Sequence, residues 1–278
     1  MPTPLPTTKV KGALGSQGSD ASKYFGLTYG PISRGAALLQ EAVVALLGGV
    51  PGAAGLVLRR AFYRGFFAEC GTKVTIGRNV TFRHACKIRL SDGVVIDDGA
   101  LVDAKGDGNA GITLDDGVYI GRNSLVYCKG GNIRLERDVN LGASCTVFSS
   151  NDLTIGAGTM VGAYSYFLSG GEYDPEVAQP FCEQSGTLTK GPLTIGANCW
   201  VGARVTVLDA ACVGEHCVLG AGAVVTKPIP PHSLVLGVPG RVVRVLPHPA
   251  AAQSASTQAS TPPTLPAQAS SPDSATRP

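Results

Sequence analysis

The chain has 278 residues, a formal net charge of +3, 37 glycines and only 15% charged residues. The weak charge and the lack of a long basic run argue against a nucleic-acid-binding protein. None of the eight cysteines forms a Cys-x-x-Cys pair. We therefore expect no metal site and interpret the cysteines as reduced thiols of a cytoplasmic protein.

The N-terminal part of the chain divides into two segments. Residues 1–23 are mostly polar and are expected to be flexible. Residues 24–70 are expected to be helical, because an apolar stretch runs through residues 32–68. Gly48, Gly49 and the proline that follows them separate this stretch into two predicted helices.

Residues 32–68 allow two interpretations that do not exclude each other. The first is an apolar cap over the open end of a repeating β-structure, where uncovered strand edges would otherwise be exposed. The second is an interfacial hairpin in which Arg59, Arg60 and Arg64 face anionic lipid headgroups. The polar residue Glu41 and the Gly-Gly break argue against a membrane-spanning helix.

A six-residue period dominates the rest of the chain. It fits neither a helix nor a simple alternating strand, and it is typical of a solenoid with a triangular cross-section. The uninterrupted run near the C-terminus is Ile195, Val201, Val207, Val213, Leu219 and Val225. The groups upstream are Ile155, Val161, Phe167; Leu135, Leu141, Val147; Leu114, Ile120, Val126; Leu90, Ile96, Val102; and Ile76, Phe82, Ile88.

Three hexads make one coil, so the pattern predicts an all-β parallel β-helix of about seven coils. This domain is predicted to span residues 71–245, with the aliphatic residues pointing inward. The period is broken longest at residues 168–192, and long loops interrupt solenoids mainly where something is bound or sealed. Residues 246–278 are expected to be disordered, because from residue 250 onward they are largely Ala, Ser, Thr and Pro.

The stretch 193–244 carries the motifs LTIGANCWVGA, GAGAVVTKPIP and GVPGRVV. It resembles the C-terminal coils of hexapeptide-repeat sugar and antibiotic O-acetyltransferases, a family with a left-handed parallel β-helix. The upstream segments FRHACKI, DAKG and YFLSGGEYD look like transferases of bacterial polysaccharide clusters. The resemblance implies a homotrimer that uses acetyl-CoA as co-substrate, without a tightly bound cofactor. It also implies a sugar or lipid-linked glycan as the acceptor.

The resemblance also suggests where CoA binds. In the family, the pantetheine arm lies between two solenoids of a trimer and bonds to the backbone of successive coils. Trp200 matches the family's tryptophan and either lines this groove or packs. The matching backbone positions are Gly202, Ala203 and Ala221. Thr226, Lys227 and Arg241 match positions near the nucleotide, where cations suit phosphates.

The general base departs from the family pattern. The family's histidine falls in the loop matching GGEYD, but this chain has no histidine between His84 and His216. Four coil spacings separate His84 from the loop, about 19 Å, so His84 is not expected to replace it. Burial could make one of the loop carboxylates Glu172, Asp174 and Glu176 a base, and we select Glu172. Tyr173 either positions a hydroxyl or donates to the oxyanion, or it packs or stacks on the substrate.

The resemblance suggests only a few residues that contact the acceptor. Ser144 and Ser149 occupy positions where the family has Asn and Asp, and Asp174 of the loop is a further candidate contact. Acyl transfer from CoA to a sugar hydroxyl is therefore the leading hypothesis. The alternative is a non-catalytic trimer that keeps the fold and sugar binding. A nucleotidyltransferase would need a phosphate-binding domain, for which the N-terminal segment is too short.

Overall fold

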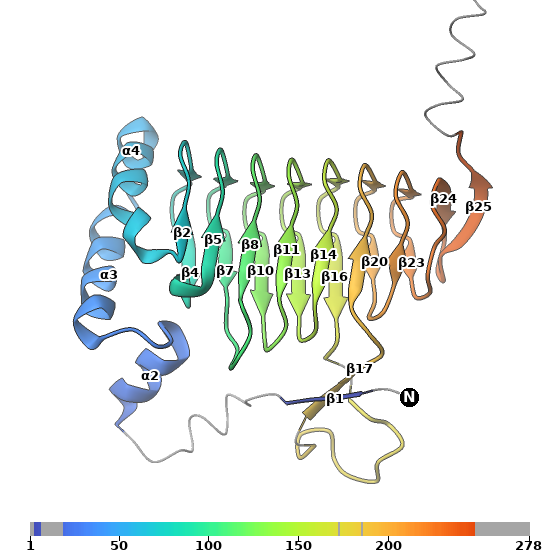
Figure 1. Ribbon diagram of the computed structural model, residues 1–278, viewed down its shortest axis with the longest axis horizontal. Coiled ribbons are helices and arrows are strands. Elements are labelled where there is room, and N and C mark those ends of the chain that lie inside the picture. Colours follow the sequence, from blue (N-terminus) through green and yellow to red (C-terminus); the bar gives the residue numbers. More distant parts are fainter. Residues whose placement is uncertain (1–2, 7–18, 172, 185, 248–278) are drawn as a thin grey trace, which may run out of the picture. The chain divides into compact units, whose positions relative to one another are not determined.

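The computed structural model describes residues 3–6, 19–171, 173–184 and 186–247. Residues 1–246 form one compact unit, built mainly from short parallel strands stacked in three sheets (Figure 1). The chain passes from face one to face two to face three and then starts the next coil. We call the two corners that matter below the two–three edge and the three–one edge. The expected tail at 246–278 lies outside the described residues from residue 248 onward.

Each face contains one strand from each of the seven described coils, and face two also contains β24 and the antiparallel β25. Face one contains β2 (Glu69–Cys70), β5 (Ile88–Leu90), β8 (Ile112–Leu114), β11 (Ile133–Leu135), β14 (Leu153–Ile155), β18 (Leu193–Ile195) and β21 (Cys212–Val213). Face two contains β3 (Thr75–Ile76), β6 (Val95–Ile96), β9 (Tyr119–Ile120), β12 (Asn140–Leu141), β15 (Met160–Val161), β19 (Trp200–Val201), β22 (Val218–Leu219), β24 (Ser233–Leu236) and β25 (Arg241–Val245). Face three contains β4 (Thr81–Arg83), β7 (Leu101–Asp103), β10 (Leu125–Cys128), β13 (Thr146–Ser149), β16 (Tyr166–Ser169), β20 (Thr206–Val207) and β23 (Val224–Val225).

The six-residue pattern correctly identified the interior. Every predicted inward residue from Ile76 to Val225 is buried, and together they form one continuous core. The first coil differs in one detail, because it runs from Cys70 in β2 through Ile76 and Phe82. Ile88 belongs to the next coil, where it shares β5 with Leu90 and both side chains point inward. The first strand of that coil, β5, therefore places one more residue in the interior than a strict hexad allows.

Helices cover the first coil (Figure 1). They are α2 (Asp20–Thr28), α3 (Arg34–Leu47) and α4 (Gly52–Tyr63), followed by the 3-10 turn η1 (Arg64–Phe66); a second such turn, η2 (Ala85–Lys87), precedes β5. Ser33 caps α3 by accepting a hydrogen bond from the backbone of Ala36. Tyr63 and Phe67 belong to the solenoid core, so the inner side of the helices seals the end of the prism. No helix in the described ranges combines the length and apolar character that crossing a bilayer needs.

Arg59 of α4 joins the helices to the first coil. Its side chain is only 2% exposed. Its Nε donates to the carbonyl of Ile76 at 2.9 Å, and its Nη1 donates to the carbonyls of Leu47 and Val50 at 3.1 and 2.8 Å. The cation thus binds carbonyls at and beyond the end of α3, where a helix dipole favours positive charge. The expectation that Arg59 faces lipid headgroups is therefore wrong.

A long loop leaves the solenoid between β16 and β18. It contains β17 (Gly186–Thr189), which pairs antiparallel with β1 (Thr3–Pro6). Figure 1 shows this two-stranded unit beside the three–one edge. The position of the interruption agrees with the segment 168–192. The structure also describes β1 and the start of α2 within residues 1–23, where the sequence indicated flexibility.

Candidate functional site

Exposed backbone amides are stacked along the two–three edge in the C-terminal coils. Ala203 and Ala221 are exposed corner residues of successive coils. In the described part of the chain, neither of their N–H groups donates to another backbone group. A Cβ at Gly202 would lie 2.6 Å from the amide nitrogen of Ala221, and one at Gly162 would lie 2.5 Å from that of Ala203. Glycine at these two corners therefore keeps the coils close and leaves the amides uncovered.

Large side chains border these amides. Trp200 is 64% exposed on face two, between Met160 of β15 and Val218 of β22. It therefore stands on the outside of the solenoid instead of packing in the interior. At the edge itself, the guanidinium of Arg204 lies 5.8 Å from the centre of the exposed Tyr164 ring. No sequence motif marks this cation–aromatic pair, which extends the bordered surface by one coil.

The other predicted cofactor residues lie elsewhere. Thr226 and Lys227 are exposed and follow β23, so they lie toward the three–one edge of the last complete coil. Arg241 is exposed in β25, which pairs with β24 at the C-terminal end of face two. Within one chain, the predicted residues thus fall on both sides of face three.

The neck of the loop is held by Asp209 on the three–one edge. This carboxylate is 5% exposed. Its Oδ1 accepts from the Gly170 backbone N–H at 2.5 Å and from the Thr189 hydroxyl at 3.1 Å, and its Oδ2 accepts from the Lys190 backbone N–H at 2.6 Å. One carboxylate therefore joins the outgoing and returning strands of the loop. No local motif marks Asp209, because its partners lie 19 to 39 positions away in the sequence.

The loop has contacts of its own beyond the neck. The Tyr173 ring is 44% exposed and lies 5.9 Å from the ring of Phe181. The Asp174 backbone N–H donates to Oε1 of the buried Gln184 at 3.0 Å, and Gln184 Nε2 donates back to the Asp174 carbonyl. Tyr173 thus lies against Phe181 while it stays accessible. Glu172, the predicted base, lies outside the described residues.

The two serines predicted to contact a sugar are not brought together. Ser149 is fully buried and donates its hydroxyl to the carbonyl of Asn132 at 2.9 Å. This leaves it no surface with which to contact a sugar. Ser144 is a corner residue with φ of 57° on the two–three edge, one coil before Tyr164. Its site is therefore the amide-lined edge and not the loop.

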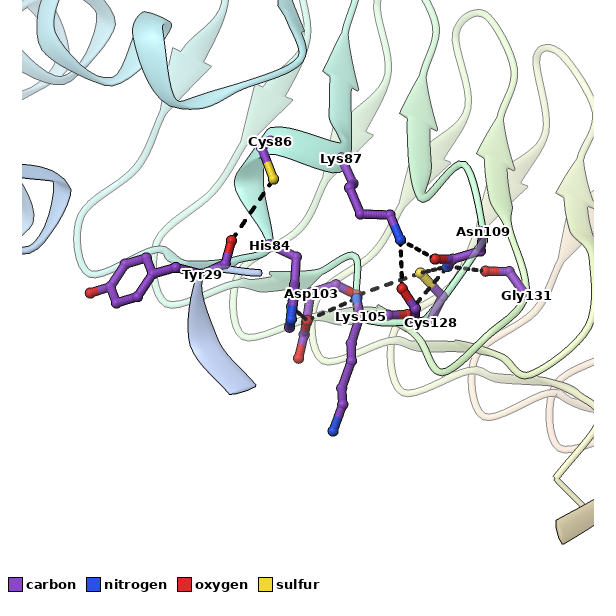
Figure 2. A network of polar contacts seen from close by, with 10 residues as sticks. Tyr29, His84, Cys86, Lys87, Asp103, Lys105, Asn109, Cys128 and Gly131 are labelled. Atoms are coloured by element: carbon purple, nitrogen blue, oxygen red, sulfur yellow. Dashed lines mark hydrogen bonds and ion pairs between the residues drawn. The ribbon is translucent and has the colours of Figure 1, made fainter. Parts of the chain in front are cut away.

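His84 belongs to a polar network near the first coil (Figure 2). Its ring is 6% exposed, and its Nδ1 lies 2.8 Å from Oδ1 of Asp103. The His84 backbone N–H donates to Thr28 at the end of α2, so this residue docks the first helix. Four strand spacings on face three separate β4 from β16, about 19 Å. His84 therefore lies far from the loop, as the repeat spacing indicated.

The rest of this network ties the insertion after β7 to neighbouring coils. The Lys87 ammonium donates to the carbonyl of Gly106 at 2.7 Å and to the side chain of Asn109. Asn109 donates in turn to the carbonyl of Gly131 and contacts Cys128 Sγ at 3.4 Å (Figure 2). Burial raises the pKa of Cys128 to about 12, so this thiol stays neutral and unreactive. The network is structural in character.

Comparisons with known proteins agree with this architecture. Residues 192–227 match the family model described as "Bacterial transferase hexapeptide (six repeats)". The chain is 30% identical over 127 residues to a "Probable acetyltransferase" of Mycobacterium tuberculosis, covering 46% of this chain and 42% of that protein. It is 30% identical over 131 residues to galactoside O-acetyltransferase of Escherichia coli, covering 45% and 62%. It thus matches less than two thirds of the length of either relative.

Solved structures include distant neighbours with a similar course of the chain. An N-acyltransferase from Bacillus cereus, AntD, solved with dTDP and 3-hydroxybutyryl-CoA, aligns with 14% identity and a TM-score of 0.49, covering 72% of this chain and 94% of that one. That similarity is too low to indicate shared chemistry. The matched hexapeptide repeat, the buried hexads and the three stacked parallel sheets together confirm the predicted parallel β-helix solenoid.

Proposed function

We propose that this protein transfers an acetyl group from acetyl-CoA to a sugar hydroxyl of a surface polysaccharide or of its lipid-linked precursor. The observation that carries the proposal is the row of uncovered amides at Ala203 and Ala221, bordered by the exposed Trp200. All three lie within the matched repeat. A pantetheine arm carries amide carbonyls that can accept from such N–H groups. The relative named galactoside O-acetyltransferase supports a sugar as acceptor.

The chemistry assigns different tasks to the loop and the edge. The acceptor hydroxyl attacks the thioester carbonyl, its proton goes to a base, and CoA leaves as the thiol once the sulfur is protonated. We propose that the loop supplies the base from Glu172 and orients the hydroxyl with Tyr173. Asp174 completes the acceptor side. Acetyl-CoA is a cytoplasmic metabolite, so we place the reaction there.

The division of the predicted residues between two edges supports a homotrimer. Trp200 and the amides border the two–three edge, whereas the loop and Lys227 lie toward the three–one edge. These two edges of one prism face away from each other across face three. They approach each other when prisms pack side by side around a threefold axis. One chain then provides the amides for the arm, and its neighbour provides the loop and the cation.

We expect acetyl-CoA to bind saturably, at one site per chain, to a particle with the mass of three chains. Trp200 is the sole tryptophan, so its emission should change during the titration. Lys227→Ala should weaken binding about fivefold, because one exposed cation–phosphate contact contributes roughly 1 kcal/mol. Calorimetry, tryptophan emission and light scattering measure the three quantities.

A matched control for Lys227 is Lys73→Ala, which changes an exposed lysine at the opposite end of the solenoid. It should leave the dissociation constant unchanged. The absence of detectable binding at millimolar acetyl-CoA would contradict the transferase and favour the non-catalytic protein.

We expect Tyr173→Phe to lower acetyl transfer about tenfold or more, if its hydroxyl orients the acceptor or donates to the oxyanion. The change keeps the ring and its contact with Phe181. Tyr173→Ala removes that contact as well and should also raise the acceptor KM. Transfer is measured as CoA thiol release in a screen of sugar acceptors. Full turnover by Tyr173→Phe would assign this residue to packing, and the same result with Glu172→Gln would exclude the proposed base.

A further inference from the structure

The outer side of the helical cap carries a group of exposed apolar side chains. We call this surface the cap face. Leu46, Leu39 and Leu38 of α3 are 74%, 63% and 56% exposed, and Val57 and Phe62 of α4 are 66% and 55% exposed. All five are large hydrophobic side chains drawn from two helices that pack on each other. Such a concentration on one surface indicates an interaction site.

Sealing the solenoid does not explain the cap face. The residues that seal it are on the inner side, where Val43, Val44 and Leu47 of α3 pack against the core. A terminal cap that meets only water has a polar outer face, because that face keeps the protein soluble. The outer side of α3 instead has leucines and alanines from residue 35 to residue 46, with Glu41 as its one charged residue. The cap face therefore has the composition of a surface that another molecule covers.

The charges around the cap face are positive. Arg34 at the start of α3 and Arg60 and Arg64 at the end of α4 are exposed. The Nε of Arg60 donates to the carbonyl of Val74 in the first coil at 2.8 Å, so this side chain is directed toward the solenoid. Arg34 and Arg64, which begins η1, are the other exposed arginines of the cap. Glu41 is the only acidic residue from 34 to 68, and its carboxylate accepts a hydrogen bond from the Tyr24 hydroxyl at 2.9 Å.

We propose that the cap face binds the surface of an anionic lipid bilayer. The leucines, Val57 and Phe62 enter the boundary between headgroups and acyl chains, and Arg34 and Arg64 contact lipid phosphates. Charge favours this partner over a second copy of the chain. Two cap faces in contact would place their arginines against each other, whereas anionic headgroups neutralise them. The proposal does not depend on the acyl-transfer activity, although it suits a lipid-linked acceptor.

Co-sedimentation with vesicles tests the proposal on the full chain. The two preparations are phosphatidylcholine alone and phosphatidylcholine mixed with phosphatidylglycerol. The protein is expected to bind the mixed vesicles at least tenfold more tightly, and the binding should weaken as salt screens the arginines. Leu46→Ser combined with Val57→Ser, and separately Arg34→Glu combined with Arg64→Glu, should each reduce binding to the mixed vesicles more than tenfold.

Val245→Ser is the matched control, because Val245 is 73% exposed on β25 at the other end of the solenoid. It should bind vesicles like the unaltered protein. Unchanged melting and acetyl-CoA binding show that the cap-face variants are folded. The proposal is overturned if the unaltered protein binds neither vesicle preparation, or if the double variants bind the mixed vesicles as tightly as the unaltered protein does. It is equally overturned if the cap face instead joins two trimers, which the serine variants would separate in light scattering.

Discussion

Asp209→Asn is expected to loosen the loop and to lower acetyl transfer at least tenfold, while the affinity for acetyl-CoA stays within about twofold. The buried carboxylate accepts three hydrogen bonds, from Gly170, Thr189 and Lys190. An amide has one acceptor oxygen, and its NH2 group must face a donor. A buried N–H group left unpaired costs about 1–3 kcal/mol. The outgoing and the returning strands of the loop both depend on Asp209 as their acceptor. In the proposed mechanism, Asp209 thus positions the loop that carries Tyr173 and does not touch the substrate.

Hydrogen exchange separates this role from general destabilisation. In the variant, the amides of Gly170 and Lys190 should exchange about tenfold faster or more, while those of the solenoid strands keep their protection. Asp138→Asn is the control, since Asp138 is an exposed corner residue with φ of 58°, a conformation that asparagine also tolerates. Equal losses of acetyl transfer and acetyl-CoA binding, or unchanged loop exchange, would show that Asp209 does not position the loop.

Arg59→Met is expected to reduce the free energy of unfolding by about 3 kcal/mol or more. Methionine has a similar length but donates no hydrogen bond. The carbonyls of Ile76, Leu47 and Val50 would lose their shared donor in a buried site. For a domain of this size the loss corresponds to a fall of the melting temperature of about 6–12 °C. Arg59→Lys should recover only part of it, because a single ammonium cannot span the three carbonyls.

Circular dichroism at rising temperature measures this effect. Arg34→Met, which alters an exposed arginine of the same cap, should melt within about 1 °C of the unaltered protein. If Arg59→Met and Arg34→Met melted alike, the contacts of Arg59 would contribute little, and the cap would be held by its apolar inner side alone.

The interior of the protein was predictable from the sequence because it depends on a local rule. A hexad places its aliphatic residue inward wherever it occurs, so residues such as Ile120, Val201 and Leu219 could be assigned one by one. The same rule located the long loop, since the period stops after Phe167 and resumes at Ile195. The apolar stretch and its Gly-Gly break likewise predicted the helices of the cap.

Residue type and local motif were a weaker guide to the site. Ser149 matched a position expected to bind a sugar, yet it is fully buried as the last residue of β13. Arg59 looked like one of three equivalent arginines, but only its neighbours Arg60 and Arg64 are exposed. Burial of a polar side chain depends on which carbonyls or amides reach it, and adjacent residues do not encode that.

By itself, the sequence determined the fold class, the number of coils, the inward residues, the position of the loop and the two alanines of the amide-lined edge. Tertiary structure alone decided that Asp209 closes the neck of the loop, that Arg59 is buried, and that the predicted site is divided between two edges of the prism. The physical reason is the range of the interactions. Hexad burial acts within one turn of chain, whereas these contacts form between segments that only the stacking of coils brings together.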